Sequence, residues 1–170
     1  MIDPFEIVKL LKLIPHPEGG YYREVYRSGE ILNREALPSR YNGDRSLSTS
    51  IYYMLIGEQI SHFHRLKSDE IWHFNTGTTI ILHFLDEKSG YQKINLGNNL
   101  HLNERPQCII KQGIYFSAEL TDKNSFALIG CTVAPGFDFD DFEFAIGESL
   151  IKLFPDQANL IKRLSKYTIL

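Results

Sequence analysis

The sequence predicts a mainly β fold, a sandwich or a barrel, with one short helix at each end of the chain. Segments rich in β-branched and aromatic residues fill its middle part, and turn residues such as glycine and asparagine separate them. These segments are residues 21–27, 48–56, 70–75, 78–85, 91–96, 108–111, 114–118 and 125–133. Many short strands at near-regular spacing are typical of sandwiches and barrels. Because the 170 residues contain no internal repeat and no linker-like stretch, we expect a single domain over residues 1–170.

Helix signals lie at both ends of the chain. Asp3 can cap a helix, Pro4 suits its first turn and Glu6 completes a capping box. Near the C-terminus, Pro155 and Asp156 can start a last helix. Apolar residues at helical spacing follow each signal: Ile7, Leu10, Leu11 and Ile14 in the first helix, and Leu160, Ile161 and Leu164 in the last.

The charge balance argues against several partner classes. The chain has 18 Lys and Arg against 21 Asp and Glu, so it lacks the basic field that drives nucleic-acid binding. Its longest apolar runs, such as residues 51–56, are far shorter than the roughly 20 residues of a membrane span. Asp3 and Glu6 stand where a secretory signal would be apolar, so we expect a cytoplasmic protein with no membrane partner. Cys108 and Cys131 lie in strand-like runs, as reduced core cysteines do.

Two histidines and a glutamate form the first candidate site. His62 and His64 stand two residues apart, so on a regular strand both side chains project to the same face. Glu70 follows on the next strand-like segment. Two imidazoles and a carboxylate can bind a divalent transition metal or move a proton. The alternative is a group of polar residues at a barrel mouth.

The spacing of these residues resembles the first sequence motif of the cupin family. Gly57 opens the segment, His62, His64 and Glu70 follow, and Gly77 closes it. In cupins such a motif places the histidine pair and the glutamate in the lumen of the barrel. The gap to the first histidine is one residue shorter here than in the usual pattern, and the gap before Glu70 one residue longer.

The second cupin motif departs from the family pattern. Aligned on Gly113, the chain has Lys111 where cupins have a proline and Phe116 where they have a metal-binding histidine. The resemblance therefore implies at most three ligands, His62, His64 and Glu70, for Fe, Mn, Ni or Zn. A site that lacks one imidazole should hold metal less tightly.

Three longer segments are similar to the signatures of one branch of uncharacterised cupin-superfamily proteins. They are PEGGYYRE at 17–24, HRLKSDEIWHF at 64–74 and GCTVAPGFDFDDFE at 130–143. In the central signature His64 fits the pattern, whereas His62 looks optional. The resemblance implies a cupin-type double-stranded β-helix, that is, a jelly-roll barrel, and a homodimer. It also implies a structural likeness to dTDP-4-keto-6-deoxyhexose 3,5-epimerases, which is an analogy at the level of the fold.

Further residues are candidates for substrate binding. Glu18 lies in a Pro-Glu-Gly-Gly turn before a strand, and Arg23 on that strand can anchor a carboxylate or phosphate, although it can equally be a surface residue. Trp72 shares a strand face with Glu70 and would raise the pKa of that carboxyl by desolvation, or else belong to the core. On a regular strand His73 points outward. The alternating aromatic and acidic residues at 137–144 suggest a strand with a bulge.

Three functions fit these residues. The first is an isomerase or epimerase for a polar, sugar-like or phosphorylated carbonyl compound, in which His64 is the base, Glu70 orients or protonates it, and Glu18 with Arg23 holds the substrate. The second is a metal-dependent cupin enzyme, a dioxygenase or metallo-isomerase, that uses His62, His64 and Glu70. The third is a binding module that captures a small molecule without converting it.

Overall fold

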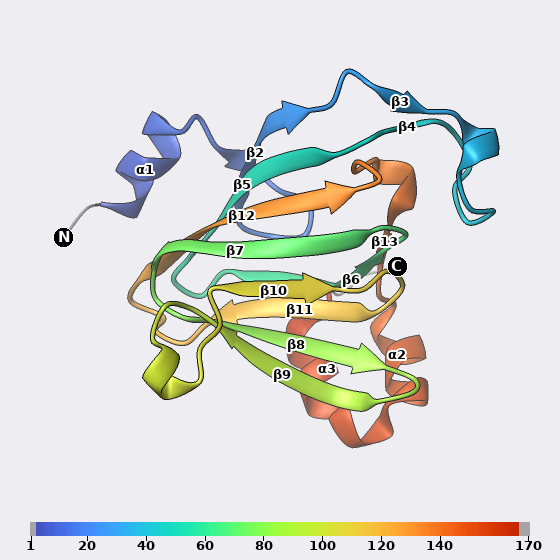
Figure 1. The fold of residues 1–170 in the computed structure, drawn as a ribbon. Helices are drawn as coiled ribbons and strands as arrows, with labels where there is room; N and C mark the ends of the chain where they lie inside the picture. Colours follow the sequence, from blue (N-terminus) through green and yellow to red (C-terminus); the bar gives the residue numbers. More distant parts are fainter. Residues whose placement is uncertain (1–2, 167–170) are drawn as a thin grey trace.

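The computed structural model describes residues 3–166 and contains two antiparallel β-sheets that face each other (Figure 1). The first sheet comprises, in spatial order, β1 (Ile14–Pro15), β2 (Tyr21–Arg27), β5 (Thr49–Ile56), β12 (Phe126–Ala134), β7 (Asp69–Gly77) and β10 (Gln107–Ile110). The second comprises β13 (Phe142–Phe144), β6 (Ile60–Leu66), β11 (Tyr115–Leu120), β8 (Ile80–Asp86) and β9 (Gly90–Leu96). A short ribbon pairs β3 (Ile31–Leu32) with β4 (Arg45–Ser46). The helices are α1 (Pro4–Leu10), α2 (Gly147–Leu153) and α3 (Ala158–Leu164), and 3-10 turns occupy Arg34–Ala36, Leu100–Leu102, Phe139–Asp141 and Pro155–Gln157.

The order of the strands is that of a jelly roll. From β5 to β13 the chain passes from one sheet to the other at every connection except the hairpin between β8 and β9. Strands that are neighbours in sequence therefore face each other across the interior, whereas hydrogen-bonded neighbours come from distant parts of the chain. The mainly β, jelly-roll fold predicted from the sequence is confirmed, as are the short helices near both ends.

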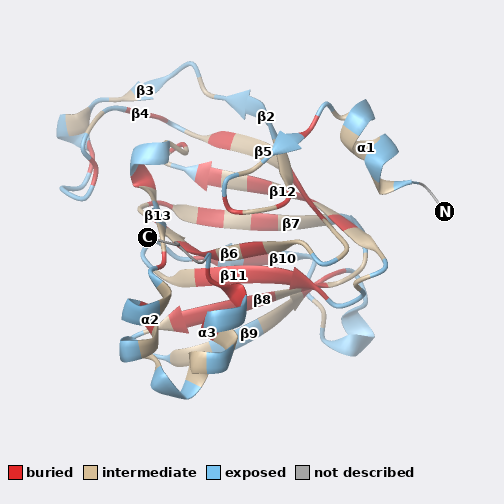
Figure 2. Ribbon diagram, turned by 180° about the vertical axis from the view of Figure 1, so that it is seen from behind, coloured by how far each residue is buried: buried red, intermediate tan, exposed pale blue. Residues whose placement is uncertain are grey.

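Two apolar clusters stabilise the molecule. The larger fills the space between the sheets and includes Trp72, Phe116 and Tyr53. The smaller joins the outer face of the second sheet to α2 and α3 through Phe63. Figure 2 shows the buried residues concentrated on the strands, with exposed residues on α1 and on the outer faces of the C-terminal helices. Because the larger cluster occupies only part of the interior, space remains for a cavity between the sheets.

Some elements differ from the sequence-based expectation. The strand β6 and the helix α2 were not predicted as such, and the last helix begins with a 3-10 turn at Pro155–Gln157. The prediction of a bulged strand over residues 137–144 is wrong: residues Phe139–Asp141 form a 3-10 turn, and only Phe142–Phe144 pair as a strand. Asp138 accepts a hydrogen bond from the backbone N–H of Asp140, which favours the turn.

The N-terminal helix begins as predicted but packs differently. Asp3 accepts a hydrogen bond from the backbone N–H of Phe5, and Pro4 occupies the first turn. The apolar side chains do not enter the barrel, since Leu10 is 71% exposed and Ile14 55% exposed. Cys108 and Cys131 are free and buried. Among residues 3–166, none of the helices has both the length and the apolar character that crossing a membrane requires.

Candidate active site

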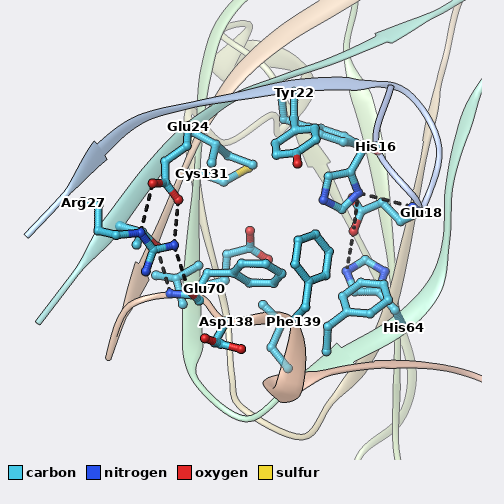
Figure 3. Close-up of a pocket in the computed structure, with 17 residues that line it drawn as sticks. His16, Glu18, Tyr22, Glu24, Arg27, His64, Glu70, Cys131, Asp138 and Phe139 are labelled. Carbon is cyan, nitrogen blue, oxygen red and sulfur yellow. Dashed lines mark hydrogen bonds and ion pairs between the residues drawn. The ribbon is translucent and has the colours of Figure 1, made fainter. Parts of the chain in front are cut away.

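A cavity of about 390 Å³ opens between the two sheets at one end of the barrel (Figure 3). Its walls come from both sheets, from the turn before β2 and from the segment between β12 and β13. The lining residues are His16, Glu18, Tyr22, Glu24, Arg27, Thr49, Ile51, Tyr53, His64, Leu66, Glu70, Cys131, Val133, Phe137, Asp138, Phe139 and Phe142. The predicted residues Glu18, His64 and Glu70 therefore share one cavity, whereas His62, Arg23 and Trp72 are outside its lining.

A β-bulge in β6 separates His62 from His64. Phe116 of β11 pairs with His64, and Ala118 pairs with Ser61. Residues 61–64 of β6 therefore lie opposite residues 116–118 of β11, so β6 has one extra residue. The extra residue breaks the alternation of faces: Ser61 and His64 point inward, while His62 lies near Leu164 in the C-terminal helix. The expectation that His62 and His64 share a face is therefore wrong.

The Pro-Glu-Gly-Gly turn places Glu18 inside the barrel. Gly19 and Gly20 have φ angles of 111° and 70°, in the region that favours glycine. The turn contacts the strands through backbone groups: the N–H of His62 donates to the carbonyl of Glu18 at 2.8 Å, and the Tyr53 hydroxyl donates to the carbonyl of Gly19 at 2.8 Å. This docking buries the Glu18 side chain beside β6.

Glu18 is the centre of a buried hydrogen-bonded cluster. Its Oε1 accepts a hydrogen bond from the Ser61 hydroxyl at 3.0 Å, and its Oε2 lies 3.1 Å from His64 Nε2 and 3.6 Å from His16 Nδ1. Burial raises the pKa of Glu18 and lowers the pKa of His16. Burial also lowers the pKa of His64, to about 4.

The hydrogen bonds around His64 determine where its protons lie. His64 Nδ1 is 2.7 Å from the carbonyl oxygen of His62, which can only accept, so Nδ1 carries a proton. The remaining nitrogen, Nε2, faces Glu18 Oε2, and two unprotonated acceptors at that distance would repel each other. A single proton is therefore shared between Glu18 and His64.

Glu70 is a second buried carboxyl, supplied by β7 of the other sheet. It is 7% exposed, lies beside Cys131, and burial together with the charge of Glu18 raises its pKa to about 8. The direction is the one expected from the sequence, where it was attributed to desolvation by Trp72. Because β6 and β7 belong to opposite sheets, Glu70 and His64 approach the cavity from opposite walls and not from paired strands.

The structure corrects the prediction that Arg23 holds the substrate. Arg23 lies on the outer side of β2, where it donates to the backbone carbonyl of Leu11. A bulge at Val25 shifts the alternation of β2, so that Glu24 and then Arg27 face the cavity. On a regular strand Arg27 would point away from the cavity, but the bulge turns its side chain towards it.

Trp72 and His73 occupy opposite faces of β7. Trp72 is buried in the core, with its ring 5.6 Å from Tyr53 and 6.0 Å from Phe116, so the predicted stacking wall beside the substrate is absent from the cavity lining. His73 points outward, as predicted, and contacts Gln107. Trp72 therefore packs against Tyr53, which lines the cavity, without lining the cavity itself.

The segment 137–142 closes one side of the cavity and is anchored by a buried ion pair. Arg45 Nε and Nη2 donate to the two carboxylate oxygens of Asp141 at 2.6 and 2.7 Å. The aromatic rings of Phe137, Phe139 and Phe142 on this segment line the cavity. A bidentate pair of this kind fixes orientation as well as position.

The side chains in the cavity do not fit the metal site that the cupin motif implies. His62 faces away, the ring of Phe116 packs 4.1 Å from His64 where a third imidazole would stand, and His64 Nε2 is occupied by Glu18. Within residues 3–166 no three His, Cys, Asp or Glu side chains are grouped so that they could hold a metal ion. We therefore derive no step through a metal.

Sequence reasoning missed four positions of the cavity lining. His16 directly precedes the segment 17–24 and was given no role, Tyr22 was not considered, and Arg27 faces the cavity only because of the bulge in β2. Phe139 lies in the 3-10 turn that was taken for a strand. The alternation Tyr22, Glu24 was the one signal in the sequence that could have identified the inward face of β2.

Comparisons with known proteins agree on the fold and the family. A family model described as Cupin superfamily (DUF985) matches residues 5–145. Protein SO0799 from Shewanella oneidensis has a similar structure, with a TM-score of 0.87 and 36% identity over 98% of this chain and 99% of that one. A hypothetical protein from Leishmania major has a TM-score of 0.86 and 31% identity over 98% and 100% of the two chains. The uncharacterized protein YML079W of Saccharomyces cerevisiae is 27% identical over 166 residues, covering 86% of this chain and 77% of its own.

Proposed function

The chain belongs to the DUF985 family of the cupin superfamily, and from that premise we propose that it is an isomerase or epimerase for a small polar carbonyl compound. One observation carries the proposal: the cavity contains two buried carboxyls in different protonation environments. Glu18 shares a proton with His64, whereas Glu70 has a pKa of about 8 and stands on the opposite wall. Buried carboxyls with raised pKa values in one cavity are typical of proton-transfer enzymes.

Glu70 is the proposed base. A carboxylate whose pKa lies near the working pH is a stronger base than an ordinary one, and about a tenth of it is ionised at pH 7. The sequence-based hypothesis gave this role to His64. Since His64 Nδ1 donates to a carbonyl and Nε2 faces Glu18, neither nitrogen is free to take a proton from a substrate.

His16 is the proposed hydrogen-bond donor to the substrate carbonyl. The backbone N–H of Glu18 donates to His16 Nδ1 at 3.2 Å, so Nδ1 is an acceptor and the neutral ring carries its proton on Nε2. Burial, which lowers the pKa of His16, keeps the ring neutral. Figure 3 shows its other nitrogen turned towards the open part of the cavity.

The Glu70 carboxylate takes the proton from a carbon next to the carbonyl, and the electron pair of the broken C–H bond forms the double bond of an enediolate whose oxygen accepts from His16. In a substrate with a hydroxyl on the first carbon, the hydroxyl proton then moves to the former carbonyl oxygen, and Glu70 returns the abstracted proton to the former carbonyl carbon, which gives the isomer. Alternatively, the proton shared by Glu18 and His64 is donated to the opposite face of the first carbon, which gives the epimer; Glu70 then loses the proton it took to water, and the Glu18–His64 pair regains one from water.

Solvent deuterium incorporation tests this proposal. We expect the protein in D₂O to introduce deuterium beside the carbonyl of at least one compound in a panel of aldoses, ketoses, keto-deoxy sugars and amino ketones, detected by proton NMR. Glu70→Gln should reduce incorporation at least about a hundredfold, because general-base catalysis contributes that much. The exposed carboxyl Glu58 gives a matched control, Glu58→Gln, which should retain the wild-type rate.

Two results would contradict the proposal. Equal incorporation by the wild type and Glu70→Gln would exclude Glu70 as the base. Compounds that bind and stabilise the protein but are recovered without deuterium would identify it as a binding module.

We further propose that residues 1–170 form one cupin domain that pairs as a homodimer. Phe63 of the barrel and the C-terminal helices share one apolar cluster, which supports a single domain. Large apolar side chains are exposed on α1 and on the outer face of the first sheet, including Leu10 and Ile109, which is 58% exposed. Exposed apolar surface of this extent is typical of subunit contacts.

A further inference from the structure

Besides the neutral rings of His16 and His64, the cavity lining formed by residues 3–166 has one basic side chain against four carboxyl groups. The four carboxyls are those of Glu18, Glu24, Glu70 and Asp138. Among the described residues of that lining, Arg27 is the one lysine or arginine. A site built for a phosphate or a carboxylate would instead present free guanidinium or ammonium groups.

Arg27 is already neutralised by Glu24. Its Nε donates to Glu24 Oε1 at 3.0 Å and its Nη2 donates to Glu24 Oε2 at 2.7 Å, a bidentate pair on the left of Figure 3. Nη2 also donates to the carbonyl of Phe137 at 3.1 Å. An anionic ligand would have to displace Glu24 and would approach the negative charge of Asp138.

Aromatic rings surround the space beside these acids. His16 lies 4.5 Å from Tyr22 and 6.3 Å from Phe139, measured between ring centroids, and Phe139 lies 5.0 Å from Phe137 and 6.5 Å from Phe142. The face of an aromatic ring attracts cations within about 6 Å of its centroid. Phe139 is 53% exposed, so its ring lies at the mouth of the cavity, where a ligand would meet it first.

We infer that the substrate of this site carries a positively charged nitrogen, an ammonium or alkylammonium group, and no phosphate or carboxylate. This inference rests on the proposed function, because it names the class of carbonyl compound that the site takes, and it replaces the phosphorylated class considered from sequence. A cation bound near Glu70 would also favour the carboxylate form of that group, which is the form that removes a proton.

Three compounds of the same shape test the charge preference directly. Choline is a cation, 3,3-dimethylbutan-1-ol is its uncharged isostere, and 3,3-dimethylbutanoate is an anion of similar size. We expect NMR titration of the wild-type protein to give choline about tenfold higher affinity than the alcohol, the middle of the range of cation–π contributions, and the butanoate the lowest affinity. Equal affinities for choline and the alcohol, or tighter binding of the butanoate, would overturn the inference.

A substitution in the ion pair should reverse the preference. Glu24→Gln frees the Arg27 guanidinium, so the affinity for 3,3-dimethylbutanoate should rise at least about tenfold and that for choline should fall. The matched control is Glu143→Gln, which frees Arg65 from a similar bidentate pair at the protein surface, outside the cavity lining. If Glu24→Gln changes anion affinity no more than Glu143→Gln does, the assignment of Arg27 as a neutralised cation is wrong.

These outcomes are separable from failure of the proposed function. Selective choline binding by a protein that exchanges no deuterium would uphold the ligand class and refute the isomerase. Deuterium exchange confined to uncharged or anionic carbonyl compounds would uphold the isomerase and refute the ligand class.

Discussion

Replacing Glu70 by glutamine should change how the stability of the protein depends on pH. The carboxyl of Glu70 has a pKa of about 8 in the folded protein and about 4.5 when the chain unfolds. Between those values the folded state holds a proton that the unfolded state has lost, so the contribution of Glu70 to stability falls as the pH rises through this window. Glutamine occupies the same volume and does not ionise.

The size of the effect follows from the shift. Each pH unit within the window changes the free energy of unfolding by about 1.36 kcal/mol, so the three units from pH 5 to pH 8 amount to about 4 kcal/mol. Solvent screening reduces this value only slightly, because Glu70 is only 7% exposed. The difference in free energy of unfolding between Glu70→Gln and the wild type should therefore be about 4 kcal/mol larger, in favour of Glu70→Gln, at pH 8 than at pH 5.

Urea unfolding followed by circular dichroism at intervals from pH 5 to pH 8 measures this difference. The two proteins share their other ionisable groups, including the buried histidines, so subtracting the curves isolates Glu70. Glu58→Gln provides the control, and its difference from the wild type should stay constant because Glu58 is exposed. If the wild type and Glu70→Gln differ by the same amount at every pH, to within about 1 kcal/mol, the buried neutral carboxyl does not exist.

The rate constant kcat/KM for deuterium exchange should rise about tenfold per pH unit up to about pH 8 and then level off, because Glu70 must ionise to act as a base; a rate that falls over this range would make Glu70 the acid. Arg45→Met should cost about 3–5 kcal/mol in urea unfolding, since it leaves the Asp141 carboxylate buried without its partner, and a cost below about 1 kcal/mol would show that the pair does not anchor the cavity wall. In light scattering at micromolar concentration the protein should have twice the mass of one chain, and a charge at Leu10 or Ile109 should reduce the dimer; a monomeric wild type would refute the exposed surface as an interface.

Strand signals depend on local composition and predicted a sandwich or a barrel, and the resemblance to cupins specified the jelly roll. Most predicted strands match the observed ones to within a few residues at their ends. The resemblance to the cupin motif placed Glu70 in the lumen, and the alternation of side chains along a regular strand then placed His73 on the opposite face.

The remainder of the site depends on irregular backbone that the local sequence does not reveal. One bulge in β6 turns His62 out of the barrel, and another in β2 turns Arg27 inward in place of Tyr26. Neither bulge contains a glycine, the residue whose presence in a strand often indicates a bulge. Contacts between distant segments decide the rest, such as the hydrogen bond that turns His64 towards Glu18.

The protonation of Glu70, which we infer to be a neutral carboxyl in the cavity at physiological pH, can be followed by NMR. Protein labelled with ¹³C at the glutamate δ-carbon would be titrated by NMR, and the Glu70 signal identified by its absence from Glu70→Gln. A midpoint near pH 8 is the predicted result. A midpoint near the ordinary value of about 4.5 would contradict the proposed base and the mechanism built on it.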